Sequence, residues 1–443
     1  MHPASALSSP VGNVRWQICA LIFFATTVNY LDRTVISYLK PYMAAEFGWD
    51  AASEAAYYAD IEMAFKLAYA VGMLMAGRVI DRLGTKSGYG WATFGWSVAA
   101  VAHALAGGFG GMVVSRAALG VFEAGNFPAA IKATAEWFPR KERALATGIF
   151  NSGTNIGAIL VPLSVPIMAE TMGWRSAFVV TGMLGFVWIA LWYRYYHAPH
   201  RHPSLSLEEH AYIRSEEPES GSAPPAVPWL SLLRFRQTWA FALGKLLTDP
   251  VWWFYLFWLP DFLRKEYGLT SGWQIIWPSA SVYIISTFGS IAGGWLPLKL
   301  VQSGWPVFRA RRTSMLLYAL AVTPIVFAQW LGALHMWLAI AVIGLAAAAH
   351  QAWSANIFST VSDMFPARAA GSVTGIGGMF GGLGGILLVL LIQKNLFVHY
   401  EKLGNIQAGY FIMFLICGGA YLTAWLVMNL LVPRMEPVDL RHS

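Results

Sequence analysis

The sequence contains few charged residues. Of its 443 residues, 12% are Asp, Glu, Lys or Arg, against about 25% in a typical soluble domain. This leaves too little polar surface to cover a soluble globule, so most of the chain requires lipid as its solvent. The net charge of +7 does not indicate nucleic-acid binding, because the basic residues stand in short clusters between apolar runs. Such placement is typical of loops that face an anionic membrane surface.

Cysteine is also scarce. Cys19 and Cys417 each lie inside an apolar run, and no spacing of Cys, His and acidic residues resembles a metal or redox site. A nucleophile paired with a base is missing as well. The glycine-rich run 371–385 follows no strand, so it indicates close helix packing rather than nucleotide binding. We therefore expect neither an enzyme nor a bound cofactor or metal.

Long apolar runs are abundant, and twelve stretches of about 20 residues are each long enough to cross a bilayer. Helices are required there, because lipid offers no partner to an unpaired backbone amide. The pattern predicts an all-α membrane protein with twelve transmembrane helices. The first stretch is predicted to be a retained span, since no small-residue cleavage site follows it. The stretches are 16–39, 55–77, 87–107, 111–135, 144–168, 176–193, 239–260, 274–297, 313–332, 335–361, 370–393 and 408–432.

One long polar segment, 197–236, divides the chain. Its Pro, Ser and Glu clusters predict a cytoplasmic linker, with a short surface helix around Leu207–Arg214. The predicted domains are an N-terminal six-helix bundle over 1–196 and a C-terminal one over 237–443. Of the Lys and Arg outside the predicted spans, nineteen lie in segments on the same side of the membrane as the linker, and only six lie in loops on the opposite side. This bias predicts that both termini are cytoplasmic.

The two halves also resemble each other. Glu-Trp-Phe-Pro at 136–139 matches Asp-Met-Phe-Pro at 363–366, and Thr-Gly-Ile recurs at 147–149 and 374–376 with the same offset of 227 residues. Both matches join the fourth and fifth spans to the tenth and eleventh. Parallel repeats of this kind are related by an axis along the membrane normal, so we expect two pseudo-symmetric bundles.

Ten charged residues fall inside predicted spans, all in spans one, two, four and seven. A charge at mid-membrane costs about 2.5–3.5 kcal/mol, so these helices are expected to line a polar cavity. Glu62–Lys66 and Lys245–Asp249, each four residues apart, could instead be structural ion pairs. Structural or snorkelling roles are also favoured for two of the ten, and functional roles for two others. Asp60 and Lys132 are the two with structural or snorkelling roles, and Arg33 and Glu123 are the two with functional roles. Asp32 and Arg116 complete the ten.

The loop between spans two and three resembles the signature loop of the major facilitator superfamily. Its pattern residues are Gly77, Asp81, Arg82, Gly84 and Lys86. The resemblance implies a gate at the cytoplasmic side, where the acid meets basic residues. The counterpart at 294–299 lacks the acid, so the gate is expected to be asymmetric.

Further stretches resemble the anion:cation symporter family, namely 29–33, 116–139 and 371–373. Within that family, 248–260 and 350–356 are most similar to hexuronate transporters. The resemblance implies proton-coupled import of an organic anion by alternating access, with glucuronate or galacturonate as the expected substrate. It also implies a multi-pass protein of the bacterial inner membrane.

Residue roles follow from this resemblance. Asp32 and Glu123 match the proton-linked acids, and a guanidinium suits a carboxylate because it binds both oxygens at once. Thr154 and Gly378 stand where galactonate-type relatives carry Gln and Asn, which argues against a galactonate pocket. Trp353 could pack against a sugar ring or simply fill the core, and His350 could titrate or be a hydrogen-bonded structural residue. The candidate substrate ligands are Tyr30, Arg33, Tyr69, Arg116, Lys245, His350, Gln351, Trp353 and Asn356.

Two other functions remain open. The chain could carry another organic acid, such as an aldonate or an aromatic carboxylate, or it could be a membrane sensor built on a transporter scaffold. The lack of a sizeable soluble output domain weighs against the sensor. The expected partners are a small organic anion, a proton and the lipid bilayer, without nucleic acid, and we expect a monomer.

Overall fold

The computed structural model describes residues 12–215, 228–269 and 273–438, and within them the chain is helical with no strand. Pro218, Pro224 and Pro225, which belong to the predicted linker, lie outside the described residues. The first half of the chain contains α1 (Val14–Phe47), α2 (Ala51–Leu83), α3 (Thr85–Ala102), η1 (His103–Leu105), α4 (Phe109–Glu123), α5 (Asn126–Trp137), α6 (Arg140–Met172) and α7 (Trp174–Tyr195).

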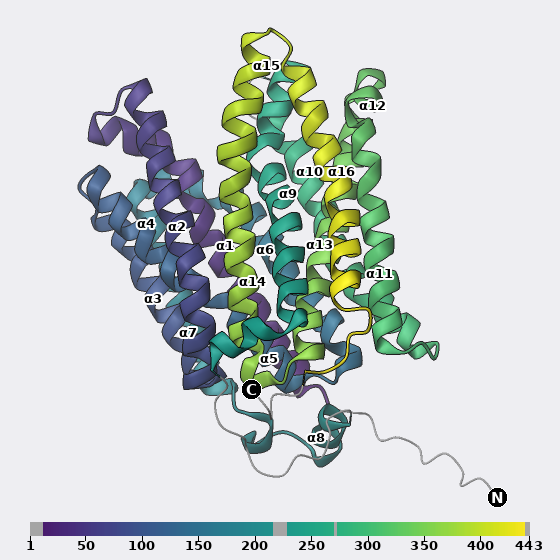
Figure 1. Cartoon of the computed structure of the whole chain (residues 1–443). Helices are drawn as coiled ribbons and strands as arrows, with labels where there is room; N and C mark the ends of the chain where they lie inside the picture. Colours follow the sequence, from purple (N-terminus) through teal and green to yellow (C-terminus); the bar gives the residue numbers. More distant parts are fainter. Residues whose placement is uncertain (1–11, 216–227, 270–272, 439–443) are drawn as a thin grey trace, which may run out of the picture.

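The second half follows a linker that contains η2 (Pro199–Arg201), α8 (Leu207–Arg214) and η3 (Trp229–Arg234). Figure 1 places α8 at one end of the molecule, which we name the linker end. The remaining elements are α9 (Arg236–Tyr267), α10 (Trp273–Gln302), α11 (Val307–Val322), η4 (Thr323–Phe327), α12 (Ala328–Leu334), α13 (Met336–Met364), α14 (Ala367–Leu387), the π-helix η5 (Leu388–Phe397), α15 (Val398–Lys402) and α16 (Ile406–Leu431).

Each predicted span falls on a helix or on a continuous series of helical segments. Among the described residues, nine helices are long and apolar enough to cross a membrane by themselves. The other three spans are the 18-residue α3, the α4–α5 pair and α9, which carries Lys245 and Asp249. The fourth span was predicted to be continuous over 111–135, but a turn at Ala124 and Gly125 divides it. The fold is therefore the predicted one of twelve spans in two six-helix bundles, although the exact bounds of the bundles and linker stay a prediction.

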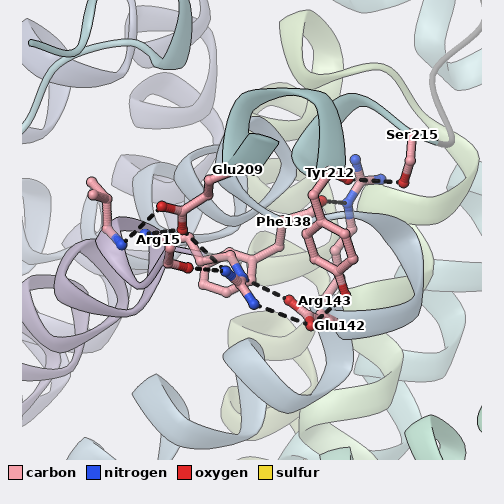
Figure 2. A network of polar contacts seen from close by, with 9 residues as sticks. Arg15, Phe138, Glu142, Arg143, Glu209, Tyr212 and Ser215 are labelled. Atoms are coloured by element: carbon pink, nitrogen blue, oxygen red, sulfur yellow. Dashed lines mark hydrogen bonds and ion pairs between the residues drawn. The ribbon is translucent and has the colours of Figure 1, made fainter. Parts of the chain in front are cut away.

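The linker helix α8 is attached to the N-terminal bundle by a buried polar network (Figure 2). The carboxylate of Glu209 accepts hydrogen bonds from the backbone N–H groups of Val14 and Arg15, each at 3.2 Å. A carboxylate suits these amides because the first N–H groups of a helix have no partner within it. The Arg15 guanidinium contacts Glu209 at 3.0 Å and Glu142 of α6 at 2.9 Å, and the Tyr212 hydroxyl donates to Glu142 at 2.7 Å. The network thus joins α1, α6 and α8.

The two bundles meet near the linker end along two seams, and Figure 1 shows their helices splayed apart at the opposite end. The first seam lies between α2 and α14 and consists of Met73, Gly77, Gly371 and Gly375. A Cβ at Gly77 would overlap the carbonyl oxygen of Gly371, and one at Gly375 would overlap that of Met73. Only glycine permits backbones to approach this closely.

The second seam lies between α10 and α6 and consists of Ser290, Gly294, Ala144 and Gly148. A Cβ at Gly294 would overlap the carbonyl oxygen of Ala144, and one at Gly148 would overlap that of Ser290. Gly148 and Gly375 are related by the offset of 227 residues that the sequence repeat predicted. The repeat is therefore expressed as two equivalent interfaces.

Candidate functional site

A cavity lies between the two bundles and holds about 570 Å³ of empty space, including its open mouth. Along α2, Tyr69 and Met73 line the cavity and Gly77 follows one turn nearer the linker end, so the first seam separates the cavity from that end. The wall is formed by Tyr30, Arg33, Tyr69, Met73, Phe127, Asn151, Thr154, Lys245, Asp249, Trp252, Trp253, His350, Gln351, Ser354, Phe358, Gly378 and Gly382. Six of the nine predicted substrate ligands belong to this wall.

Arg33 is the basic residue of the N-terminal wall. Its Nε donates to the Oε2 atom of Glu123 at 2.8 Å, and both side chains are buried. The guanidinium carbon lies 4.5 Å from the ring centroid of Tyr30 and 4.7 Å from that of Tyr69. Aromatic faces attract a cation and hold its plane in one orientation. Arg33 is therefore fixed at the cavity with part of its donor set directed to Glu123.

Glu123 lies at the break between α4 and α5. It is the last residue of α4, and its side chain is fully buried behind Arg33. The amide of Asn29 donates to its backbone carbonyl at 3.4 Å and accepts from Arg33 at 3.2 Å. The second carboxylate oxygen, Oε1, has no hydrogen bond to any residue that the structure describes. Glu123 thus has one oxygen engaged by Arg33 and one available for a proton.

Asp32, the other predicted proton-linked acid, is buried on α1 next to Arg33 but outside the cavity wall. Neither of its oxygens has a hydrogen bond within the described part of the chain. The hydroxyl of Thr181 on α7 is the polar group near this carboxyl, and burial of a polar group is costly unless it is hydrogen-bonded. The position suits a group that exchanges a proton.

Arg116 does not line the cavity, although it was predicted to contact substrate. It lies behind Arg33, where one guanidinium nitrogen contacts Glu62 at 2.6 Å and the backbone carbonyl of Arg33 at 2.6 Å. It holds the Arg33 segment of α1 against α2. Glu62 therefore pairs across helices in addition to any contact within its own helix.

The C-terminal wall carries the ion pair predicted within span seven. The Nζ of Lys245 lies 2.7 Å from the Oδ2 of Asp249 and 4.1 Å from the ring centroid of Phe358. Unlike Glu123, Asp249 faces the cavity itself. The sequence contained this pair, but Asp249 was not among the predicted ligands.

His350 and Gln351 both line the cavity, as predicted. The His350 ring stacks on Trp252 at 5.0 Å, and its Nδ1 lies 2.5 Å from the hydroxyl of Tyr421. The side-chain oxygen of Gln351 accepts from the amide of Asn151 at 2.7 Å, which joins the two bundles. These contacts give both residues structural partners as well as access to the cavity.

Neither Asn356, a predicted ligand, nor Trp353, for which core packing was the alternative, belongs to the cavity wall. Trp353 is fully buried and packs edge-on against Tyr421. The amide of Asn356 donates to the carbonyl oxygens of Gly293 at 2.7 Å and Ala352 at 2.9 Å, so it joins α13 to α10. Both stabilise the C-terminal bundle from behind the wall.

Several lining residues were missed, and the repeat could have indicated some of them. Phe127 corresponds to Ser354 and Asn151 to Gly378 by the offset of 227 residues, and all four line the cavity. The rings of Phe127 and Phe358 stack across the two bundles at 5.0 Å. Pseudo-symmetry thus brings equivalent positions to the same opening.

The signature loop contributes an acid to the first seam. Asp81 accepts from the Nζ of Lys132 at 2.9 Å and from the backbone N–H groups of Ser372 at 2.7 Å and Gly371 at 3.3 Å. Arg82 is exposed, Lys86 lies 6.0 Å from the ring centroid of Tyr193, and Gly84 adopts a left-handed φ of 79°. Lys132 was expected to be structural, and its contact connects α5 to the seam.

Two pseudo-symmetric helix bundles around a charged central cavity define a membrane transporter rather than an enzyme. Comparison with known proteins agrees, since the model of the Major Facilitator Superfamily matches residues 22–389. The chain belongs to this superfamily.

Similar proteins include transporters of sugar acids. A hexuronate transporter of Escherichia coli (strain K12) is 33% identical over 387 residues, which cover 86% of this chain and 88% of that protein. A galacturonate transporter of Dickeya chrysanthemi is 34% identical over 291 residues, covering 65% of this chain and 83% of that one. The solved structure of the proton:xylose symporter XylE has a TM-score of 0.75 at 14% identity and covers 96% of this chain and 97% of its own, which shows a shared fold.

Proposed function

We propose that this protein imports a hexuronate-like organic anion together with a proton by alternating access. In this proposal the linker end faces the cytoplasm of a bacterial cell, and the protein lies in the inner membrane. The observation that carries it is the Arg33–Glu123 ion pair at 2.8 Å, placed at the wall of a cavity between the bundles. The similarity to hexuronate and galacturonate transporters supports the substrate class.

The substrate carboxylate is proposed to bind Arg33. A guanidinium binds a carboxylate through two parallel N–H groups, but Nε of Arg33 is engaged by Glu123. Protonation of Glu123 weakens that engagement and frees the guanidinium for the substrate. Substrate binding favours protonation of Glu123 by the same free energy, since linkage between two ligands is reciprocal. Asp32, one residue from Arg33, is proposed as the second proton-linked acid.

The closed seams define the accessible side. With both seams shut at the linker end, we propose that the cavity opens toward the other side of the membrane, which is the outside in the proposed orientation. Substrate and proton then bind before the seams separate. Closure of the splayed ends and opening of the seams would release both to the cytoplasm.

Uptake into proteoliposomes tests the proposal. Labelled glucuronate and galacturonate are supplied with and without an imposed pH gradient, and a panel of aldonates and aromatic acids competes. We expect accumulation of a hexuronate that depends on the gradient. If only other acids compete, or if the gradient has no effect, the substrate or the coupling is assigned wrongly.

Glu123→Gln tests the proton carrier. We expect counterflow exchange of substrate to persist, while accumulation driven by the gradient is lost, because the amide cannot carry the proton. Full accumulation by this variant would contradict the assignment.

Arg33→Ala tests the carboxylate site. We expect a loss of binding of more than about a hundredfold, in line with about 3 kcal/mol for a charge-assisted pair. Calorimetry on purified protein measures the dissociation constant. Arg434→Ala is the matched control, because Arg434 is exposed and lies outside the cavity wall. Unchanged affinity in Arg33→Ala would move the carboxylate site to Lys245.

A further inference from the structure

The two cations of the cavity are paired with acids in different ways. Arg33 is held by Glu123, which is fully buried behind the wall. Lys245 is held by Asp249, whose side chain is 20% exposed and belongs to the wall. Among the described residues, Asp249 is the only carboxylate that lines the cavity. A bound substrate therefore meets a negative charge on the C-terminal wall and on no other part of the described lining.

The surrounding helices leave room for this carboxylate. Gly381 of α14 faces it, and a Cβ at that position would overlap Asp249 Oδ2. A glycine there lets the Asp249 carboxylate remain between α9 and α14 at the edge of the cavity. The ion pair with Lys245 then fixes the side chain from its own helix.

Apart from Arg33 and Lys245, the titratable side chains around Asp249 are tyrosines and a histidine, which can form hydrogen bonds. Tyr30 and Tyr69 line the same cavity from the N-terminal bundle, and Tyr421 of α16 lies near Asp249. His350 of α13 lines the same cavity. Since Lys245 is already paired, no unpaired cation stands among the described residues of this wall to receive a second substrate carboxylate.

We infer that Asp249 is a specificity-determining residue that selects sugar acids with one carboxylate over those with two. The inference rests on the proposed function, in which Arg33 binds the first carboxylate. The opposite end of a hexuronate carries hydroxyl groups, which donate hydrogen bonds to a carboxylate. The opposite end of an aldarate carries a second carboxylate, which Asp249 repels, and like charges brought together at a site are strongly disfavoured.

Galacturonate and galactarate are the probes, because oxidation of the anomeric carbon of galacturonate to a second carboxylate, which also opens the ring, gives galactarate. The ring opening is the same for every variant, so a change in the ratio of the two affinities reports the effect of Asp249 on the second charge. Calorimetry on the purified full-length protein gives the dissociation constant for each. We expect the unmodified protein to bind galacturonate more than about tenfold more tightly than galactarate. In Asp249→Asn this ratio should fall by more than about threefold, because the repulsion disappears and Lys245 is released to attract the second carboxylate.

The double variant Lys245→Met/Asp249→Asn is a second test in case Asp249→Asn alone does not fold, since it leaves no unpaired buried charge. The preference of the double variant for galacturonate over galactarate should also fall by more than about threefold, though less than in the single variant. The double variant removes the repulsion without adding an attraction. A smaller change in the variants that fold, or a preference of the unmodified protein for galactarate, overturns the inference. If the unmodified protein binds neither acid, the proposed function itself fails.

Discussion

The two seams at the linker end are equivalent in backbone contact but differ in charge. Gly77 approaches Gly371 in the first seam as Gly294 approaches Ala144 in the second. Among the described residues, only the first seam contains a carboxylate, because Leu298 follows Gly294 at the distance of four residues at which Asp81 follows Gly77. Close approach of backbones is thus common to both halves, while the acid is an addition to one.

Charged contacts at the second seam go to backbone carbonyls of the other bundle. Next to Ala144, the guanidinium of Arg143 donates to the carbonyl of Ser362. Within the seam, the hydroxyl of Ser290 donates to the carbonyl of Gly148 at 2.8 Å. Nearby, Arg311 is held by Asp363 of its own bundle at 2.9 Å and donates to the carbonyl of Arg140 at 3.1 Å. The comparison indicates that glycine contacts make closure possible in both seams, whereas Asp81 adds strength to only one.

The largest expected effect comes from filling either glycine contact. Gly77→Val and Gly294→Val each place side-chain atoms against a backbone carbonyl, which cannot rotate away. We expect both variants to lose the closed seam and to lower uptake by more than about tenfold, since overpacking of about 1.4 kcal/mol or more changes an equilibrium tenfold. Spin labels at the exposed Leu83 and Trp305 report the separation of the bundles at this end.

Gly419→Val is the matched control. Gly419 lies in α16, and a Cβ there would meet nothing within 4 Å. The control has the same change in helix propensity without the overlap, so label distance and uptake should stay close to those of the unmodified protein. If Gly77→Val acted and Gly294→Val did not, the proposed equivalence of the two seams would be wrong.

Asp81→Asn is expected to have an intermediate effect that is confined to the first seam. The ion pair with Lys132 is buried, with 6% and 4% of the two side chains exposed. Removing one partner of a buried pair outright costs about 3–5 kcal/mol. Asparagine, however, still accepts hydrogen bonds from Lys132 and from the amides of Gly371 and Ser372, so the seam loses less than it does when a side chain blocks the backbone contact. We expect the distance distribution of the same labels to shift toward the open form, with a lower Tm.

Asp81→Asn/Lys132→Met separates the ion pair from the amide contacts. The double variant leaves no unpaired lysine, so it should recover part of the lost closure, as coupled neighbours do in double-mutant cycles. An unchanged distance distribution in Asp81→Asn would show that the glycine contacts alone determine closure of both seams.

Hydropathy and spacing were sufficient for the spans and for contacts within one helix. The pair Lys245–Asp249 could be foreseen, because residues four apart share a helix face. Arg33–Glu123 and Arg116–Glu62 could not be foreseen as pairs, because each joins two helices whose rotation depends on packing. The break after Glu123 was missed for a related reason, since hydropathy does not detect a single turn.

The least reliable part of the prediction was which side chains of a span face the cavity. Trp353 and Asn356 lie on the same helix as His350 and Gln351, yet only the latter two line the cavity. A span buried on most of its sides has no polar stripe that marks its cavity face. The repeat offset carried more information, because it relates Phe127 to Ser354 and Asn151 to Gly378 across the opening.

Ser290→Ala should have the smallest effect. It tests the neutral hydrogen bond of the second seam, for comparison with the charged contact of Asp81 in the first. The variant removes a neutral hydrogen bond to the Gly148 carbonyl, worth about 0.5–1.5 kcal/mol, together with a 3.4 Å contact from the Asn151 amide, and leaves the glycine contacts intact. We expect a small opening of the second seam, below that of Asp81→Asn, in the same label measurement. Ser281→Ala on the same helix is the control, because its hydroxyl donates to the carbonyl of Trp277 within α10 and, among the described residues, to no group of the other bundle. An effect of Ser290→Ala as large as that of Asp81→Asn would mean that the buried charge adds no strength to its seam beyond that of a hydroxyl.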